Sequence, residues 1–422
     1  MPAPRTARRL LLCFALAALA LIALPAAAAA QQGTAVARAS GHHAGLAEAR
    51  KLATPNPCRL ARQNLSSLRG GKASAPRRQR LQQRLQRCQP RTPKAAASAA
   101  TGPLYWGAWI GDQLTGTEAP WDLGAIEKFE GMAGKQASLI NFSSPFADCS
   151  RNPCSFYKFP KAEMESIRAH GSIPVFSWAS QATPASLNQP EFQLADVIAG
   201  NHDAYIREWA EAAKAWGHPF FLRFNWEMNG GWFAWAEGVN GNQGGEYVAA
   251  WRHVHDIFEA VGATNATWVW CPNVDPTDSL QDLAPLYPGD EYVDWTGLDG
   301  YNWGTNPVRP DRWRSFDDLF RSTYDEITQQ IAPGKPLLVS EVGSTEHGGS
   351  KAAWIADALK SASTNYPQLR GLVWFEKFDD GMDWPIETSS SSASAFAAGI
   401  QSPSFLGNSF ASIAPGTVQP AA

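Results

Sequence analysis

Two glutamates stand where a short apolar run gives way to polar residues. Glu227 follows the run Phe220–Trp226, and Glu341 follows the run Pro336–Ser340. A carboxylate at the end of an apolar strand is costly unless it is used or paired, because charge near a low-dielectric core loses hydration. Two carboxyl groups about 5 to 5.5 Å apart can cleave a glycosidic bond with retention, one as acid and one as nucleophile. We therefore predict such a catalytic pair, with two separate structural salt bridges as the alternative.

Aromatic and amide side chains that suit sugar binding accompany both glutamates in the sequence. Indole faces stack on sugar rings, and amides such as those of Asn273 and Asn302 bind hydroxyl groups. Tyr301 is expected to donate a hydrogen bond to Glu341, and Arg223 is expected to keep Glu341 ionised or else to form an ion pair in the barrel floor. The predicted substrate-binding residues are Arg223, Trp226, Asn229, Trp232, Tyr301, Trp303 and Trp374. For any single tryptophan, core packing is the alternative.

Eight short apolar runs alternate with amphipathic stretches from Gly102 onward, which is typical of βαβ units. The expected strands are Tyr105–Ile110, Ala137–Phe142, Ile173–Trp178, Phe220–Trp226, Thr267–Cys271, Val293–Leu298, Pro336–Ser340 and Gly371–Phe375. The expected helices are Trp121–Glu130, Lys161–His170, Ala204–Trp216, Glu246–Val261, Asp317–Ile331 and Ser350–Thr364. This pattern predicts an α/β fold, a single (β/α)8 TIM barrel, whose chemistry lies at the carboxyl ends of its strands.

The first 30 residues are typical of a secretory signal peptide. Three arginines precede the apolar run Leu10–Leu24, and Ala28 and Ala30 form an A-x-A cleavage pattern before Gln31. No other run approaches the ~20 apolar residues that a membrane span needs. We therefore predict a secreted protein without a transmembrane segment in the mature chain.

A basic N-terminal extension follows the signal. Residues 31–101 hold 14 Lys and Arg against one acid, Glu48, and contain no Trp, Phe or Tyr, so they cannot bury a core alone. The rest of the chain carries 19 basic and 38 acidic residues, a net charge of −19. Two interpretations of the extension stay open: contact with an anionic cell surface or polymer, or a segment that is solvated or folded back on the acidic body.

The predicted organisation is a signal peptide (1–30), the basic extension and linker (31–101), a catalytic barrel (102–406) and a C-terminal tail (407–422). A body with a net charge of −19 would repel phosphate backbones, so we expect no nucleic-acid partner. The expected partner is a polysaccharide substrate, and the expected state is a monomer.

Five cysteines remain once the signal is removed, which suits an exported protein with two disulfides and one buried thiol, Cys271. The predicted disulfides are Cys149–Cys154 and Cys58–Cys88. Loop 148–159, around the first of them, and the glycine-rich loop 238–245 are candidates for shaping a substrate cleft. Plain surface loops are the alternative for both.

Three motifs resemble glycoside hydrolase family 26. The run Arg223–Gly230, followed by Trp232, resembles that family's acid/base motif. The family's sixth strand is similar to Tyr292–Asn302, and its nucleophile strand and following helix are similar to Lys335–Glu341 with Lys351 and Trp354. The similarity covers residues 102–405 and leaves out the basic extension.

This resemblance implies a retaining endo-hydrolase acting on β-mannan, mixed-linkage β-glucan or β-xylan. It makes Glu227 the acid/base and Glu341 the nucleophile, with Tyr301 as its partner, while Trp232 and Trp374 line the sugar site. Glu227 is expected to be protonated at rest because of its apolar surroundings and the nearby Glu341. One departure leaves the sugar open: the family usually has His immediately before its acid/base, where this chain has Trp226.

The sequence also bears on three rival functions. A metallohydrolase is disfavoured because the eight histidines form no H-E-x-x-H set, and the double-displacement chemistry needs neither a metal nor an organic cofactor. A non-hydrolytic polysaccharide-binding or cell-envelope protein would have no need of both Glu227 and Glu341. A transglycosylase uses the same two glutamates and differs only in what reaches the intermediate first.

Overall fold

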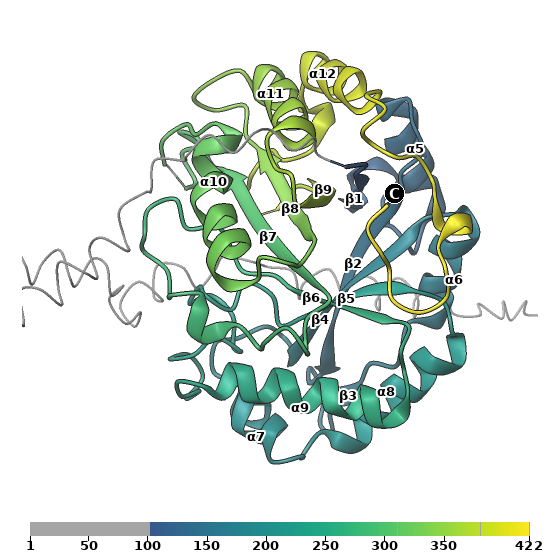
Figure 1. The fold of residues 1–422 in the computed structure, drawn as a ribbon, viewed down its shortest axis with the longest axis vertical. Helices are drawn as coiled ribbons and strands as arrows, with labels where there is room; N and C mark the ends of the chain where they lie inside the picture. Colours follow the sequence, from purple (N-terminus) through teal and green to yellow (C-terminus); the bar gives the residue numbers. More distant parts are fainter. Residues whose placement is uncertain (1–101, 310, 380, 422) are drawn as a thin grey trace, which may run out of the picture.

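The computed structural model describes residues 102–309, 311–379 and 381–421, which form a closed barrel of parallel strands inside a layer of helices (Figure 1). The predicted signal peptide, the basic extension and the Cys58–Cys88 disulfide lie outside the described residues. The predicted (β/α)8 barrel is confirmed.

Eight strands make the barrel: β1 (Tyr105–Ile110), β2 (Leu139–Asp148), β4 (Ile173–Thr183), β5 (Phe220–Phe224), β6 (Ala266–Trp270), β7 (Trp295–Asn302), β8 (Leu337–Ser344) and β9 (Leu369–Glu376). Each predicted strand overlaps one of them. β1 pairs with β9 and also with β2, which closes the barrel. Gly107 permits this closure, because a Cβ there would lie 1.7 Å from the carbonyl oxygen of Leu139.

Helices cover the outside of the barrel. They are α5 (Leu123–Ala133), α6 (Lys161–His170), α7 (Leu194–Ile198), α8 (Asp203–Trp216), α9 (Glu246–Val261), α10 (Phe316–Glu326), α11 (Lys351–Thr364) and α12 (Ser390–Ile400). α10 begins at a capping box of Ser315 and Asp318 and runs on into a π-helical turn, η5 (Ile327–Ile331). The short 3₁₀ turns are η2 (Asp112–Leu114), η3 (Pro190–Phe192), η4 (Ala284–Leu286), η6 (Ile386–Thr388) and η7 (Phe410–Ser412).

The main core lies between the strands and the helices. All eleven residues of β4 are buried, as expected for a parallel strand covered on both faces. Trp178 of β4 stacks on Trp209 of α8 with ring centroids 4.5 Å apart. Ten of the 18 tryptophans are fully buried, so core packing accounts for most of the unusual tryptophan content.

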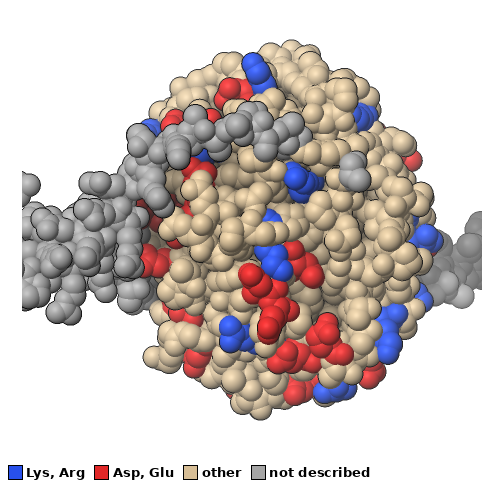
Figure 2. Space-filling model, viewed as in Figure 1, with Lys and Arg blue, Asp and Glu red and all other residues tan. Residues whose placement is uncertain are grey.

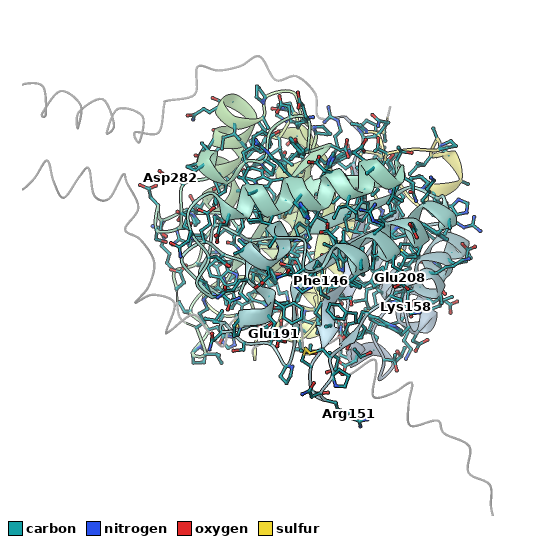
Figure 3. All side chains as sticks on the ribbon, turned by 90° about the horizontal axis from the view of Figure 1, so that it is seen from below. Phe146, Arg151, Lys158, Glu191, Glu208 and Asp282 are labelled. Carbon is teal, nitrogen blue, oxygen red and sulfur yellow. A yellow bond between two sulfur atoms is a disulfide. The ribbon has the colours of Figure 1, made fainter. Side chains whose placement is uncertain are left out.

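The two loops expected to shape a cleft are both tied to neighbouring segments. The predicted Cys149–Cys154 disulfide is present, and β3 (Ser155–Phe156) returns antiparallel to β2. Figure 3 shows Arg151 of this loop projecting at the edge of the molecule, while Phe146 of β2 lies inside. Loop 238–245 is held by reciprocal bonds between the Asn240 side chain and the backbone of Gln189, at 2.7 and 3.0 Å.

The segment predicted as a C-terminal tail packs across the amino ends of the strands. Val418 is fully buried; its amide donates to Thr267 Oγ1 (2.7 Å), and its carbonyl oxygen accepts from Trp295 Nε1 (2.9 Å). Figure 1 shows this segment, in yellow, crossing in front of the strands. Residues 407–421 therefore contribute to the packing of the barrel.

The outer surface mixes charges of both signs. Acidic and basic side chains are interspersed on the face drawn in Figure 2, with most of the area contributed by other residues. Within the described part of the chain, no helix combines the length and apolar content needed to cross a bilayer.

Candidate active site

Glu341 is placed by an irregularity in the barrel. The pairing registers of β8 with β7 and with β9 both shift beside Ser340 and Glu341, so β8 carries a bulge there. Bulges re-aim side chains near functional sites. The bulge lies at the middle of β8, and the Glu341 side chain is fully buried.

Two side chains bind the carboxylate of Glu341. Arg223 of β5 donates from Nη1 to Glu341 Oε1 at 2.9 Å, and the hydroxyl of Tyr301 on β7 donates to Oε2. Burial and the nearby Glu341 raise the pKa of Tyr301, which keeps its phenol protonated and able to donate. Both contacts agree with the geometry expected from the sequence.

Glu227 lies in a tight turn that begins where β5 ends. The backbone of Asn225 (φ 46°) and of Glu227 (φ 52°) is left-handed, a conformation that non-glycine residues hold at a cost of order 1–3 kcal/mol. The turn is fixed because the Glu227 amide donates to the Cys271 carbonyl oxygen (2.7 Å) and the Asn225 amide donates to that of Trp178 (3.0 Å). Strain of this kind is typical of functional sites.

Both oxygens of Glu227 accept hydrogen bonds. Asn273 Nδ2 donates to Oε1 at 2.7 Å, and Trp232 Nε1 donates to Oε2 at 2.5 Å. The Trp232 ring reaches this position because residue 230 is glycine: a Cβ there would lie 2.4 Å from the ring. Asn229 holds Asn273 in place through two reciprocal 2.8 Å bonds to its backbone.

The two glutamates meet across the barrel. One carboxylate oxygen from each of Glu227, Asp299 and Glu341 lies within 4.8 Å of the others. Among the residues that the structure describes, these three carboxylates are spaced closely enough to hold a cation. The guanidinium of Arg223, which bonds both Asp299 and Glu341, already supplies a fixed positive charge there and disfavours a metal ion.

Asp299 is a site residue that the sequence analysis did not single out. It is fully buried at a register shift of β7, forms an ion pair with Arg223, and accepts a bond from the Cys271 thiol at 3.2 Å. Burial raises the pKa of Asp299 against the opposing effect of Arg223, and burial also raises the pKa of Cys271. The sequence could have indicated Asp299 as a site residue, because it directly follows the expected strand Val293–Leu298.

The predicted aromatic residues divide into two groups. Trp232 and Trp303 are half-buried, and Trp303 packs at the edge of a second hydrophobic cluster at the carboxyl end of the barrel. Trp226 is almost fully buried against Phe233 and Trp235, with ring centroids 5.3 and 5.0 Å away. Trp226 therefore contributes to packing next to the glutamate turn.

Trp374 lies elsewhere than predicted. Its ring packs on Trp354 of α11 and Phe396 of α12, between the barrel and its helices. The physical reason is strand alternation, since consecutive residues point to opposite faces and Phe375 takes the inward position. We correct the prediction accordingly: Trp374 belongs to the outer packing layer.

The second hydrophobic cluster, which we call the aromatic cluster, consists of Trp109, Tyr301, Phe375, Met382 and Trp384. Its rings surround Tyr301, with the Phe375 and Trp384 centroids 5.6 and 4.9 Å from it. Sequence reasoning missed Trp384 because it lies in a loop, beyond the last expected strand. The period-two pattern of β9 could have indicated Phe375.

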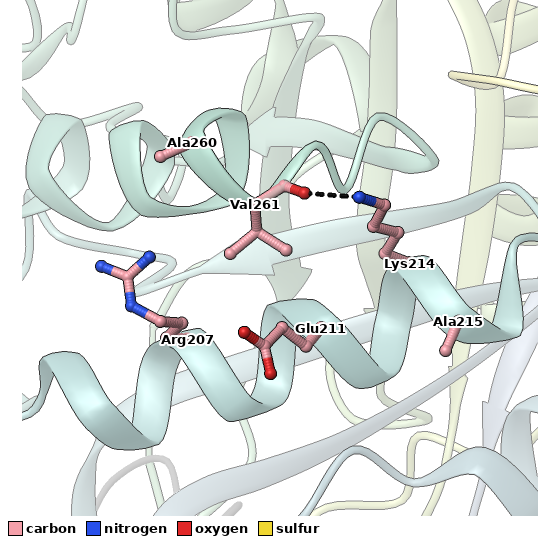
Figure 4. A pocket seen from close by; sticks show the side chains of 6 residues that line it. All are labelled: Arg207, Glu211, Lys214, Ala215, Ala260 and Val261. Atoms are coloured by element: carbon pink, nitrogen blue, oxygen red, sulfur yellow. Dashed lines mark hydrogen bonds between the residues drawn. The ribbon is translucent and has the colours of Figure 1, made fainter.

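A shallow surface depression lies far from these carboxylates. It is formed between α8 and α9 by Arg207, Glu211, Lys214, Ala215, Ala260 and Val261, and Lys214 Nζ donates to the Val261 carbonyl oxygen at 2.8 Å (Figure 4). It lies in the outer helical layer, so it plays no part in the arrangement around Glu227 and Glu341.

The model of glycosyl hydrolase family 26 matches residues 162–335. Endoglucanase H of Acetivibrio thermocellus is 34% identical over 305 residues, covering 70% of this chain and 30% of the relative. Over these residues the chain is similar to glycosyl hydrolase family 26. The predicted resemblance is thereby confirmed for the barrel.

Two further relatives are similar to parts of this chain. A mannan endo-1,4-beta-mannosidase of Bacillus subtilis is 31% identical over 244 residues, 54% of this chain and 60% of the relative. Beta-1,3-xylanase TXYA of Vibrio sp. is 29% identical over 195 residues, 44% of this chain and 37% of the relative. The chain thus spans less than two thirds of each of these three relatives.

A solved structure agrees on the fold of the family 26 barrel. The catalytic domain of an endo-beta-1,4-mannanase from Bacillus sp. JAMB-750 superimposes with a TM-score of 0.54 at 17% identity, covering 74% of this chain and 88% of that domain. At this level of identity the likeness concerns the fold alone.

Proposed function

We propose that this barrel is a family 26 retaining endo-glycoside hydrolase that cleaves a β-linked polysaccharide by double displacement. The observation that carries the proposal is the spacing of Glu227 and Glu341, whose nearest carboxylate oxygens lie within 4.8 Å. Retaining enzymes hold their carboxyl groups about 5 to 5.5 Å apart, whereas inverting enzymes leave roughly 6.5 to 9.5 Å for a water molecule.

Each glutamate has surroundings that suit its proposed role. Glu341 acts as nucleophile; Arg223 and Tyr301 each donate a hydrogen bond to its carboxylate and hold it in place. Glu227 first protonates the leaving oxygen and then deprotonates the water that hydrolyses the glycosyl-enzyme. Burial beside Glu341 favours its protonated form, while the donors Asn273 and Trp232 favour the ionised form that the second step requires.

A β-glucan is the first substrate to test. The relative that aligns with 70% of this chain at 34% identity is named an endoglucanase. A mannosidase aligns with 68% of the chain but at only 20% identity, and other mannosidases and xylanases align with about half or less. The replacement of the family's histidine by the buried Trp226 removes an imidazole beside the proposed acid/base, so β-mannan is not the default. β-Mannan and β-xylan complete the panel.

Export and surface contact are further parts of the proposal. The N-terminal sequence supports secretion through a cleaved signal peptide, and the 14 basic residues of 31–101 support contact with an anionic envelope polymer. We propose that the mature enzyme is a monomer that needs no cofactor.

The test is product release from mixed-linkage β-glucan, β-mannan and β-1,3-xylan by the wild type, Glu227→Ala and Glu341→Ala. The matched control is Glu211→Ala, which removes an exposed glutamate from α8. We expect activity on one polymer that both site variants lose by a factor of 10² or more and that the control retains.

Two results would change the assignment. Activity that survives Glu341→Ala would exclude the double-displacement mechanism, and the absence of activity on every polymer would favour a non-hydrolytic binding protein. With an oligosaccharide of the hydrolysed polymer as substrate, products longer than that oligosaccharide would identify a transglycosylase. The glycosyl-enzyme would then react with a sugar before it reacts with water.

A further inference from the structure

Trp384 is the member of the aromatic cluster that comes from a loop. The loop runs from the end of β9 to α12, and Trp384 is nearly fully buried, with its ring centroid 4.9 Å from that of Tyr301. Tyr301 in turn donates its hydroxyl proton to Glu341. A loop side chain thus backs the residue that orients the proposed nucleophile.

Lys351 holds this loop on both sides of Trp384. Its Nζ donates to the carbonyl oxygens of Asp383 (2.5 Å) and Pro385 (2.7 Å), the residues directly before and after the tryptophan. A third bond goes to Thr388 Oγ1 at 2.9 Å. An ammonium has three donors, so its hydrogen-bonding capacity is fully used within this one loop.

The position of Lys351 is unusual for a lysine. It is the first residue of α11, in the segment that follows β8, and its side chain is fully buried. Figure 1 shows α11 and α12 side by side over β8 and β9. Burial lowers the pKa of Lys351 to about 8. A buried ammonium is costly, so its retention here calls for a role that the helix alone does not supply.

We propose that Lys351 is a positioning residue for catalysis, which fixes Trp384 against Tyr301 and thereby keeps the Tyr301 hydroxyl on the carboxylate of Glu341. This inference rests on the proposed function of Glu341 as nucleophile. Lys351 itself touches neither the glutamates nor, in this role, the substrate. It acts through two intermediate side chains.

Three neighbouring hydrogen bonds hold the loop in a defined conformation that Lys351 reinforces. Asp383 accepts bonds from Thr345 Oγ1 (2.5 Å) and the Glu346 amide (2.9 Å), which tie it to the end of β8. The Ile386 amide donates to Glu376 Oε2 at 2.9 Å. These contacts flank Trp384, whereas Lys351 binds the two carbonyl groups on either side of it.

The test compares the pH dependence of kcat/KM on an aryl β-glycoside for the wild type, Lys351→Met, Tyr301→Phe and the double variant. The matched control is Lys360→Met, the same substitution at an exposed position of α11. We expect Lys351→Met to lower kcat/KM roughly 10- to 100-fold, as small misplacements of reacting groups do. Its acid limb should move to higher pH, as that of Tyr301→Phe should, because a carboxylate that loses a hydrogen-bond donor is protonated more readily.

The double variant separates positioning from simple destabilisation. If Lys351 acts through Tyr301, then Lys351→Met adds little to Tyr301→Phe in rate or in acid limb, since non-additivity reports shared action. Independent losses that multiply, or a Lys351→Met profile like that of Lys360→Met, would overturn the proposal. Lys351→Gln, which keeps a shorter donor, replaces Lys351→Met if the latter does not fold.

Failure of the proposed function gives a different result. In that case Glu341→Ala keeps its activity and Tyr301→Phe leaves the acid limb unchanged, whatever Lys351→Met does. The Lys351 variants test the positioning role only if two results hold: Glu341→Ala abolishes activity, and Tyr301→Phe shifts the acid limb.

Discussion

Arg223 connects the carboxylates of the site. It is fully buried, donates to Ser177 Oγ (2.9 Å) and Glu341 Oε1 (2.9 Å), and forms an ion pair with Asp299. A buried charge network is stable only while every charge keeps its partner, because desolvation costs several kcal/mol per ion. Arg223 is therefore as much a structural requirement as a hydrogen-bond donor to the proposed nucleophile.

Replacing Arg223 by Met is expected to lower the free energy of unfolding by about 3–5 kcal/mol, because Asp299 and Glu341 remain as unpaired buried carboxylates. Urea denaturation measures this loss. The control is Arg321→Met: Arg321 is 34% exposed and its two ion pairs lie on the surface, so we expect a change of about 1 kcal/mol or less. Equal effects of the two substitutions would contradict the role assigned to Arg223.

Glu227→Ala tests the acid/base role with a substrate whose leaving group needs no proton. We expect polymer hydrolysis to fall by about 10² or more, while an aryl glycoside with an acidic phenol still forms the glycosyl-enzyme. Azide should then restore turnover and give a glycosyl azide of retained configuration, because the alanine leaves space for a small anion. Product configuration is measured by NMR, and Glu341→Ala should give no product of retained configuration, because azide can then react only by a single, inverting displacement.

At the scale of elements, two backbone irregularities aim the site. The bulge in β8 places Glu341, and the left-handed turn after β5 places Glu227. The sequence predicted which strands end in these residues, because each apolar run stops at a glutamate. The residue pattern of β8 did not predict its one-residue bulge, because a bulge depends on how the strand pairs with its neighbours.

The alternation of strand residues explains the error at β9. Trp374 was chosen for its type, but the helices α11 and α12 occupy the side to which it points. α12 itself was not predicted, because its sequence Ser390–Ile400 is rich in serine and alanine and has a weak apolar stripe. Without α12, nothing in the sequence marked the outer face of β9 as buried.

The carboxyl-terminal ends of α5 and α6 are joined by a pH-dependent contact. His170 Nε2 lies 3.3 Å from Glu130 Oε2, and this hydrogen bond raises the pKa of His170. A raised folded-state pKa gives stabilisation that is complete below the unfolded value of about 6.5 and is lost as pH rises through the folded value. The contact therefore stabilises the barrel on the acid side of neutrality.

His170→Gln should remove this pH dependence. We expect the Tm difference between wild type and His170→Gln to be largest near pH 5.5 and to shrink towards pH 8.5, measured by calorimetry at fixed ionic strength. The exposed His347→Gln serves as control. A difference that stays constant across this range would show that protonation of His170 does not contribute.

At the scale of the whole molecule, the proposed catalytic glutamates and the C-terminal segment lie at opposite ends of the barrel. Glu227 and Glu341 lie towards the carboxyl ends of their strands, whereas the C-terminal segment crosses the amino ends. The sequence predicted the barrel well because eight apolar runs and their helices repeat. It gave no sign that residues 407–421 belong to it, because this segment contributes isolated contacts such as Val418 and no periodic pattern.

Removal of residues 407–422 should therefore separate stability from catalysis. Loss of the buried side chains of Phe410 and Val418 is expected to lower the free energy of unfolding by about 3–6 kcal/mol, at roughly 1.5–3 kcal/mol for each buried side chain.

At 20 °C, kcat of the folded enzyme should stay within about twofold, because the reacting carboxylates lie at the other end of the barrel. Val418→Asp should reproduce much of the loss, since it puts a charge at a fully buried position without shortening the chain. The exposed Gln419→Ala should leave both quantities unchanged. If kcat of the folded, truncated enzyme falls together with its free energy of unfolding, then the amino end of the barrel controls the geometry of the glutamates.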